Sequence, residues 1–141
     1  MMKKFEFLIG SWSLKYTVPE SFMSGAASGE GTGTFRRALN DKYVFFDYQA
    51  ELTTGSAHAH GIFAKDTLQD LYRYWWFEDS GSFLTATCRF LDENTLFMNW
   101  HDTLLIQTFE KKDEDRILLQ MSYPAEQQIF QPVLIVELSR I

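Results

Sequence analysis

The chain has 141 residues, and its 45% content of hydrophobic residues predicts one globular domain spanning residues 1–141. The net charge of −6 and the isoelectric point near 5.0 argue against nucleic acid and anionic membranes as partners, because both need a basic surface. Cys88 is the single cysteine, which excludes an internal disulfide and fits a reducing, cytoplasmic location.

The first predicted elements are a helical turn over residues 3–9 and a strand directly after it. In that strand Trp12, Leu14, Tyr16 and Val18 alternate with polar residues. Successive side chains of a strand point to opposite faces, so these four are predicted to point inward from a half-buried strand.

The remainder of the chain alternates between strand-like runs and turn residues such as Asp, Asn, Gly and Ser. Residues 19–29 break this rhythm and predict a long loop with Phe22 and Met23 at its apolar tip. Further strands are predicted at residues 30–39, 43–52, 57–64, 71–78, 83–91, 95–101, 104–111, 116–123 and 132–140. About ten strands with short links predict an all-β, closed up-and-down antiparallel barrel.

Strand parity then predicts how the two ends of this barrel differ. The two long connections, residues 19–29 and 124–131, fall at the same end, which we call the mouth. The other end, the floor, receives the short polar turns and the N-terminal helical turn. Parity also brings Trp12 beside Arg140 at the floor, where a guanidinium over an indole is favourable by roughly 0.5–2 kcal/mol.

The residues at the two ends of the chain also carry a resemblance. Gly10-Ser11-Trp12 after a short N-terminal segment, with Arg140 late in the last strand, resembles the lipocalin and fatty-acid-binding-protein (calycin) superfamily. The segment from Phe5 to Trp12 and the run from Tyr74 to Gly81 are similar to bacterial lipocalin-like domains of unknown function. The resemblance covers the whole chain.

This resemblance implies a barrel of roughly ten strands with a mainly apolar pocket and no fixed activity. The haem-binding nitrobindins are a neighbouring group, but their late-strand histidine has no counterpart here, because no His follows His101. The cofactor is therefore left open. The predicted ligand-contacting residues are Tyr16, Val18, Phe22, Met23, Phe46, Tyr48, His58, His60, Tyr74, Trp76, Met98, Trp100, Leu119 and Met121.

The three histidines of the chain are candidate metal ligands. His58 and His60 share a strand face, and His101 falls at the same end of another strand, so a three-His site is conceivable. Against it, the two strands are not neighbours, and the alternation around Trp100 points His101 outward. We therefore predict no metal site and assign His58 and His60 to the rim of the pocket, where they would orient a polar head group.

Acidic residues within the predicted strands are candidate general acids. Glu51, Glu78 and Glu137 would each serve if the side chain faced inward, whereas the alternation around Asp47 points it outward. Cys88 shares a face with apolar residues and is predicted to be a buried structural thiol.

Three functions remain open at the sequence level. The preferred one is a protein that binds a small apolar or amphipathic molecule in the barrel cavity. The second is a small enzyme of isomerase, cyclase or hydrolase type that uses the same cavity. The third is a protein-interaction module with a filled barrel. Both faces of the strand from Tyr74 to Phe77 are aromatic, so we also predict a homodimer that covers the outer face.

Overall fold

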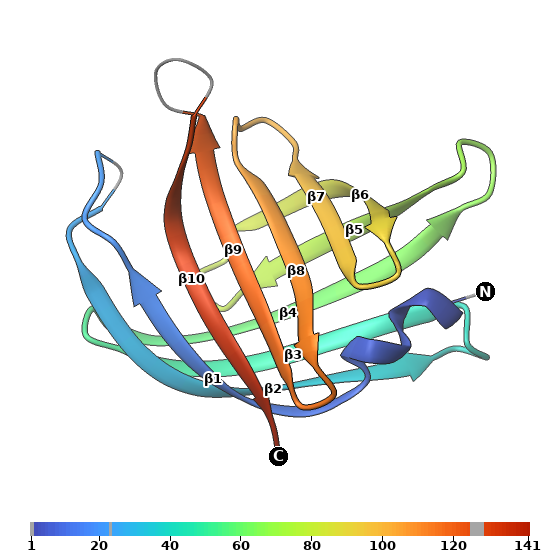
Figure 1. Ribbon diagram of the computed structural model, residues 1–141, viewed down its shortest axis with the longest axis horizontal. Coiled ribbons are helices and arrows are strands. Elements are labelled where there is room, and N and C mark those ends of the chain that lie inside the picture. Colours follow the sequence, from blue (N-terminus) through green and yellow to red (C-terminus); the bar gives the residue numbers. More distant parts are fainter. Residues whose placement is uncertain (1, 23, 125–128) are drawn as a thin grey trace.

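The computed structural model describes residues 2–22, 24–124 and 129–141, and these form a closed antiparallel barrel (Figure 1). A 3₁₀ helix, η1, precedes the first strand. The elements are η1 (Lys3–Leu8), β1 (Gly10–Val18), β2 (Ala27–Ala38), β3 (Tyr43–Leu52), β4 (Gly55–Asp66), β5 (Leu71–Glu78), β6 (Phe83–Asp92), β7 (Thr95–Trp100), β8 (Ile106–Asp113), β9 (Arg116–Pro124) and β10 (Phe130–Arg140). The predicted fold class, an all-β barrel with an N-terminal helical turn, is confirmed.

Every strand pairs with its neighbours in the chain, and β1 also pairs with β10, which closes the sheet. This is an up-and-down meander in which each of the ten described strands is paired on both sides. Strand β2 begins at Ala27, because this residue pairs with Val18 at the end of β1. Strand β8 begins at Ile106, because the chain turns over residues 101–105, where Asp102 has a φ of 61°. The loop after β1 is therefore shorter than the sequence predicted, and β8 begins later.

The inward rows of the strands follow the apolar alternation. On β1 the side chains of Trp12, Leu14 and Tyr16 are buried, with exposed residues between them. On β3 Phe46 is buried, whereas Asp47 is exposed. Alternation is this clean because one face of the sheet meets the core and the other meets water.

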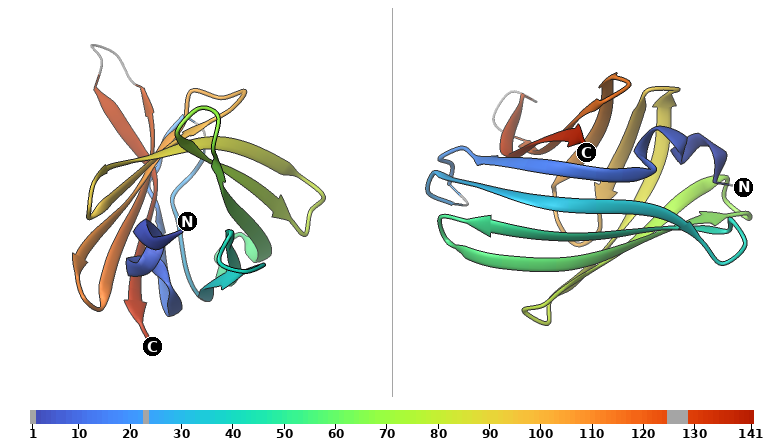
Figure 2. Two further views of the ribbon diagram at one scale, coloured as in Figure 1. Left: turned by 90° about the vertical axis from the view of Figure 1, so that its right-hand side faces the viewer. Right: turned by 90° about the horizontal axis from the view of Figure 1, so that it is seen from below.

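The barrel is closed at the floor by η1, which lies across that end (Figure 2). The ring of Phe5 enters the barrel and contacts the rings of Phe63, Tyr72 and Phe90, with centroids 4.9–5.0 Å apart. Leu8 is fully buried alongside it. The floor is therefore packed hydrophobic core, and the cavity described below lies further up the barrel.

At the floor, Arg140 on β10 contacts the segment that joins η1 to β1. Its Cα is the register partner of Trp12, and its guanidinium lies 4.2 Å from the centroid of that indole ring. Its Nη1 donates to the carbonyl of Ile9 at 2.9 Å. Gly10 has a φ of +131°, and a Cβ there would lie 2.5 Å from the same Nη1, so a side chain at this position would be both strained and obstructed.

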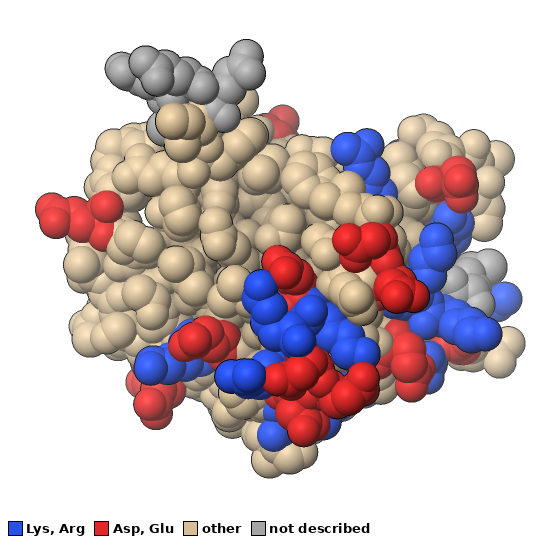
Figure 3. Space-filling model, in the orientation of Figure 1, with Lys and Arg blue, Asp and Glu red and all other residues tan. Residues whose placement is uncertain are grey.

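Charged side chains of both signs are interspersed over the lower part of the face in Figure 3, around the floor-side turns. At the mouth, to the upper left, red atoms lie without blue ones on this face. No helix in the described ranges is long and apolar enough to cross a membrane.

Candidate functional site: a cavity at the mouth of the barrel

A cavity of about 240 Å³ occupies the upper half of the barrel. It extends from Leu14 and Leu138, near the middle, to Glu78, Leu84 and Leu105 at the mouth. The other lining residues are Tyr16, Phe46, Tyr48, Tyr74, Trp76, Trp100, Gln107, Phe109, Leu119, Met121, Leu134 and Val136. An apolar lining with a few polar groups is typical of small-molecule sites.

One wall of the cavity is aromatic. The rings of Tyr48 and Trp76 are stacked with centroids 5.2 Å apart and planes at 15°, and Phe46 continues the stack at 5.7 Å from Tyr48. Tyr48 on β3 and Trp76 on β5 are separated by β4, which presents only Ala59 and Gly61 between them. These two small residues leave the space in which the flanking rings meet.

The opposite wall is aliphatic. Leu119 and Met121 on β9 and Leu134 and Val136 on β10 come from the strands across the closed sheet. A stack of near-parallel rings facing flexible aliphatic side chains suits an apolar guest that contains a flat ring, because aromatic pairs prefer offset-stacked or edge-to-face contact.

Three tyrosine hydroxyls border this space. Within the described part of the chain, those of Tyr16, Tyr48 and Tyr74 make no hydrogen bond. Burial, with smaller contributions from Glu78 and Asp79, raises the pKa of Tyr48 to about 12. Burial likewise raises the pKa values of Tyr16 and Tyr74. All three hydroxyls therefore stay neutral at physiological pH and offer both a donor and an acceptor.

Gln107 supplies a deeper polar group. Its side chain is 5% exposed, and its Oε1 accepts a 3.1 Å hydrogen bond from Nε1 of Trp100. Its amide NH₂ group donates no hydrogen bond among the described residues. A ligand acceptor that reached Gln107 would find this donor already oriented.

Glu78 is the one charged side chain among the described residues that line the cavity. It follows Tyr74 and Trp76 on the inward row of β5, and Nε1 of Trp76 approaches its Oε2 at 3.4 Å. The sequence indicated Glu78 as one of several strand carboxylates without fixing its direction. Glu78 lies two residues after Trp76, so the alternation of side chains along a strand places both on the same inward row.

Of the fourteen predicted ligand-contacting residues, the structure brings eight together at the cavity: Tyr16, Phe46, Tyr48, Tyr74, Trp76, Trp100, Leu119 and Met121. Met98 is fully buried in the core without lining the cavity, and Val18 is half-buried near the end of β1. Phe22 lies outside the cavity on the loop after β1, where its ring contacts that of Tyr123 at 4.6 Å. Met23 lies outside the described residues.

The structure does not bring His58 and His60 to the cavity, which corrects the rim assignment. Ala59 is paired with Tyr48 on the inner face, so the histidines on either side of it point outward. Nε2 of His58 lies 3.0 Å from Oδ1 of Asp47, also on the outside. Cross-strand partners share a face, so the inward assignment of Tyr48 already implied this direction once the register was known.

The third histidine lies apart from that pair. Nδ1 of His101 is 2.6 Å from the hydroxyl of Thr85. Within the described ranges no group of three His, Cys, Asp or Glu side chains is arranged to hold a metal ion.

The lining residues absent from the predicted ligand-contacting set include Leu14, whose inward direction was predicted, and positions such as Gln107 and Leu134, whose strand faces were not assigned. Gln107 lies on β8 between half-buried neighbours, and Leu134 follows a β-bulge between Pro132 and Leu134 on β10. The bulge changes the alternation, so the inward row of β10 cannot be read from Pro132 onward by counting twos. Leu84 and Leu105 occupy strand and loop ends, where periodicity carries little information.

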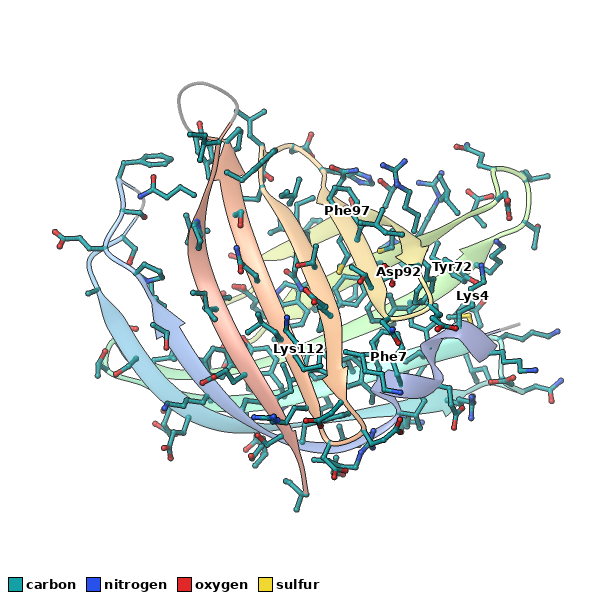
Figure 4. All side chains as sticks on the ribbon, viewed as in Figure 1. Lys4, Phe7, Tyr72, Asp92, Phe97 and Lys112 are labelled. Carbon is teal, nitrogen blue, oxygen red and sulfur yellow. The ribbon has the colours of Figure 1, made fainter. Side chains whose placement is uncertain are left out.

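A second hollow lies outside the barrel at the floor, beside η1. Figure 4 labels Lys4 and Phe7 on η1 with Tyr72 and Asp92 on the strands next to it, and all four border this groove of about 1100 Å³. Its lining mixes basic and acidic side chains. Charges of both signs neutralise one another, so the groove presents no uniform field to a ligand.

The outer face of β5 keeps the aromatic character on which the homodimer prediction rests. Trp75 is half-buried there, and Phe77 is 45% exposed. Phe83, the register partner of Phe77 on β6, is 70% exposed. The homodimer stays a prediction, which light scattering on the purified protein would decide.

Comparison with known proteins gives a likeness of fold. No protein-family model and no curated protein matches the sequence. Among solved structures, Rv2717c from M. tuberculosis is similar with a TM-score of 0.68 at 12% identity, over 99% of this chain and 96% of that one. The S-type phycobiliprotein lyase CPES from Guillardia theta has a TM-score of 0.62 at 8% identity, over 99% and 91% of the two chains. The redesigned barrel mFAP1 has a TM-score of 0.54 at 10% identity, over 96% of each chain. At these identities the matches show a likeness of fold alone, that of a closed antiparallel barrel.

Proposed function

We propose that this protein binds a small apolar or amphipathic molecule in the cavity at the mouth of its barrel, and that it is a lipocalin-like binding protein. The observation that carries the proposal is the cavity itself. A volume of about 240 Å³ lies above a packed floor and is lined mainly by apolar side chains. A dry cavity of about 150 Å³ is known to accept benzene, so this one has room for a two-ring molecule.

The fold neighbours agree with this use of the architecture. The redesigned barrel mFAP1 is described as bound to DFHBI, a small molecule. The sequence identity between mFAP1 and this chain is 10%, so no residue can be carried over from it. Its support for the proposal is that a barrel of similar fold holds a small molecule. The cavity also speaks against the interaction-module alternative, which needed an interior filled by side chains.

The described lining favours binding over catalysis. The tyrosine hydroxyls are weak acids because burial raises each pKa, and burial also raises the pKa of the Cys88 thiol. Among the described lining residues, Glu78 makes no hydrogen bond to a second titratable side chain that would act as its acid or base partner; its contact is the indole of Trp76. General acid–base catalysis is most effective with a positioned group whose pKa lies near the operating pH, which the raised pKa values of these tyrosines and of Cys88 do not provide.

A neutral, environment-sensitive naphthalene dye, prodan, tests the proposal. We expect a saturable blue shift of its emission with one molecule bound per chain, because the cavity excludes water from most of the ring. The variant Met121→Trp adds a large side chain to the aliphatic wall and should abolish the shift. The matched control is Leu118→Trp, which places the same side chain on the outer face of β9.

Two results would overturn the proposal. One is the absence of any saturable uptake of prodan. The other is equal uptake by both tryptophan variants after circular dichroism shows that each is folded, because binding would then lie outside the barrel.

A further inference from the structure

We propose that the cavity selects flat aromatic molecules that carry a positive charge, such as a protonated amine, and that Glu78 and the acidic mouth of the barrel provide this selection. The inference rests on the proposed function, because it names the class of ligand for the same cavity. It commits to a cationic group at the mouth end and a flat ring against the stacked aromatic wall.

Glu78 stands where a cation could meet both a carboxylate and aromatic faces. It is on the same inward row as Trp76, whose ring is stacked with Tyr48. Aromatic faces attract cations, and the attraction grows when the cation is removed from water. A carboxylate next to such rings supplies a charge-assisted hydrogen bond as well.

No positive side chain competes for Glu78 in the described lining, where it is the one charged group. The nearby basic residue of the same strand, Arg73, is on the outward row and its Nε is bonded at 2.8 Å to Asp66. A carboxylate ligand, such as a fatty acid, would therefore enter a cavity that offers it a negative charge and no counter-charge. Desolvating two like charges together is unfavourable.

The connections at the mouth carry the same sign. Their described residues are 19–22, 24–26, 53–54, 79–82, 101–105 and 129, and they include Glu20, Asp79 and Asp102 but no Lys or Arg. Figure 3 shows this end without blue atoms on the face in view, whereas both signs mix near the floor. A rim of one sign raises the local concentration of the opposite ion and speeds its association. The net charge of −6 acts in the same direction.

Three naphthalenes that share one ring system and differ in charge test the inference: 2-(aminomethyl)naphthalene, 2-naphthylmethanol and 2-naphthoate. Calorimetric titration at about pH 7 and low salt should rank their affinities as cation, then neutral alcohol, then anion. We expect the cation to bind about tenfold more tightly than the alcohol, which corresponds to about 1.4 kcal/mol. Raising NaCl from about 20 mM to about 500 mM should narrow the difference, because salt screens the field of the rim.

The variant Glu78→Gln keeps the size of the side chain and removes its charge. It should bring the cation and the alcohol to within about twofold of each other. The control is Glu51→Gln, which removes an equal charge near the mouth from the outside of β3, where Ser56 contacts its Oε2 at 2.7 Å. That variant should keep most of the preference for the cation.

Each outcome decides between the two proposals. Equal binding of all three naphthalenes by the natural protein overturns charge selection and leaves the binding function in place. An unchanged preference in Glu78→Gln overturns the role of Glu78. If none of the three binds while prodan does, the inference fails and the proposed function stands. If prodan also fails to bind, both fail.

Discussion

Arg140 should be the most costly surface-accessible residue to remove, because it joins the last strand to the segment that closes the floor. Its guanidinium lies over the indole of Trp12, and it donates to the carbonyls of Ile9 at 2.9 Å and Glu114 at 3.2 Å. The side chain is 32% exposed, so each contact is expected to contribute at the lower end of the range usual for its kind.

The magnitude follows from these contacts. A partly exposed cation–π contact contributes about 0.5–1 kcal/mol, and hydrogen bonds from a charged donor contribute about 1.5 kcal/mol each at the low end. We therefore expect Arg140→Ala to lower the free energy of unfolding by about 3 kcal/mol, allowing for contributions that do not add fully. Arg140→Lys keeps the charge but loses the planar stacking and the forked donors, and should cost about half as much.

Urea unfolding followed by far-ultraviolet circular dichroism measures both values, because this signal does not depend on the fluorescence of Trp12. The matched control is Arg116→Ala. The Arg116 side chain is 70% exposed and makes an ion pair with Asp113 at 3.0 Å, so its removal should cost less than about 1 kcal/mol. If Arg140→Ala and Arg116→Ala were equally stable, the contacts at the floor would not contribute to closing the barrel.

Three further predictions concern the cavity and the core. Gly61→Ala places a methyl group against the hydroxyl and ring of Tyr74, so it should lower the free energy of unfolding by about 1–3 kcal/mol and weaken prodan binding. The control is Gly25→Ala, whose methyl group would contact no other atom and should change neither property. Equal unfolding free energies of the two variants would contradict the close packing of Gly61 against Tyr74. Because the pKa of Tyr48 is raised to about 12, the stability it contributes is present below about pH 10 and is lost as pH rises from 10 to 12. Tyr48→Phe should therefore show a smaller fall in melting temperature than the natural protein over that interval, and an identical fall would argue against burial of the hydroxyl. Finally, Cys88 is buried with a raised pKa, so its thiol should react with Ellman's reagent only after unfolding, and rapid reaction of the folded protein would disagree with this position.

Much of the fold could be predicted because strand periodicity is a local property. Residues 43–52 and 71–78 were predicted with the boundaries that the structure shows. Clean alternation along β1 indicated which side chains face the core, and short polar turns indicated a meander. The tryptophan of the Gly-Ser-Trp segment and the late Arg140 were sufficient to expect contact at the floor.

The candidate site was predictable only in part, because it depends on register between strands. The inward row of β5 could be read from Tyr74 and Trp76, and Glu78 lies two residues further along this row, although its direction was left open. The direction of His58 and His60 could not be read from their own strand, since each row of β4 carries one large apolar residue, Phe63 on one and Ile62 on the row of the histidines. It was decided by the pairing of Ala59 with Tyr48.

The amino-acid sequence by itself determined that this chain forms a meander of half-buried strands, because side-chain alternation and turn chemistry act over a few residues. The closing of β1 onto β10 then decided how large a hollow remains and which side chains meet in it. Small residues on β4 bring together the rings of β3 and β5, and no local pattern records that contact. The cavity is a property of the whole closed wall, because packing joins residues that are distant in the chain.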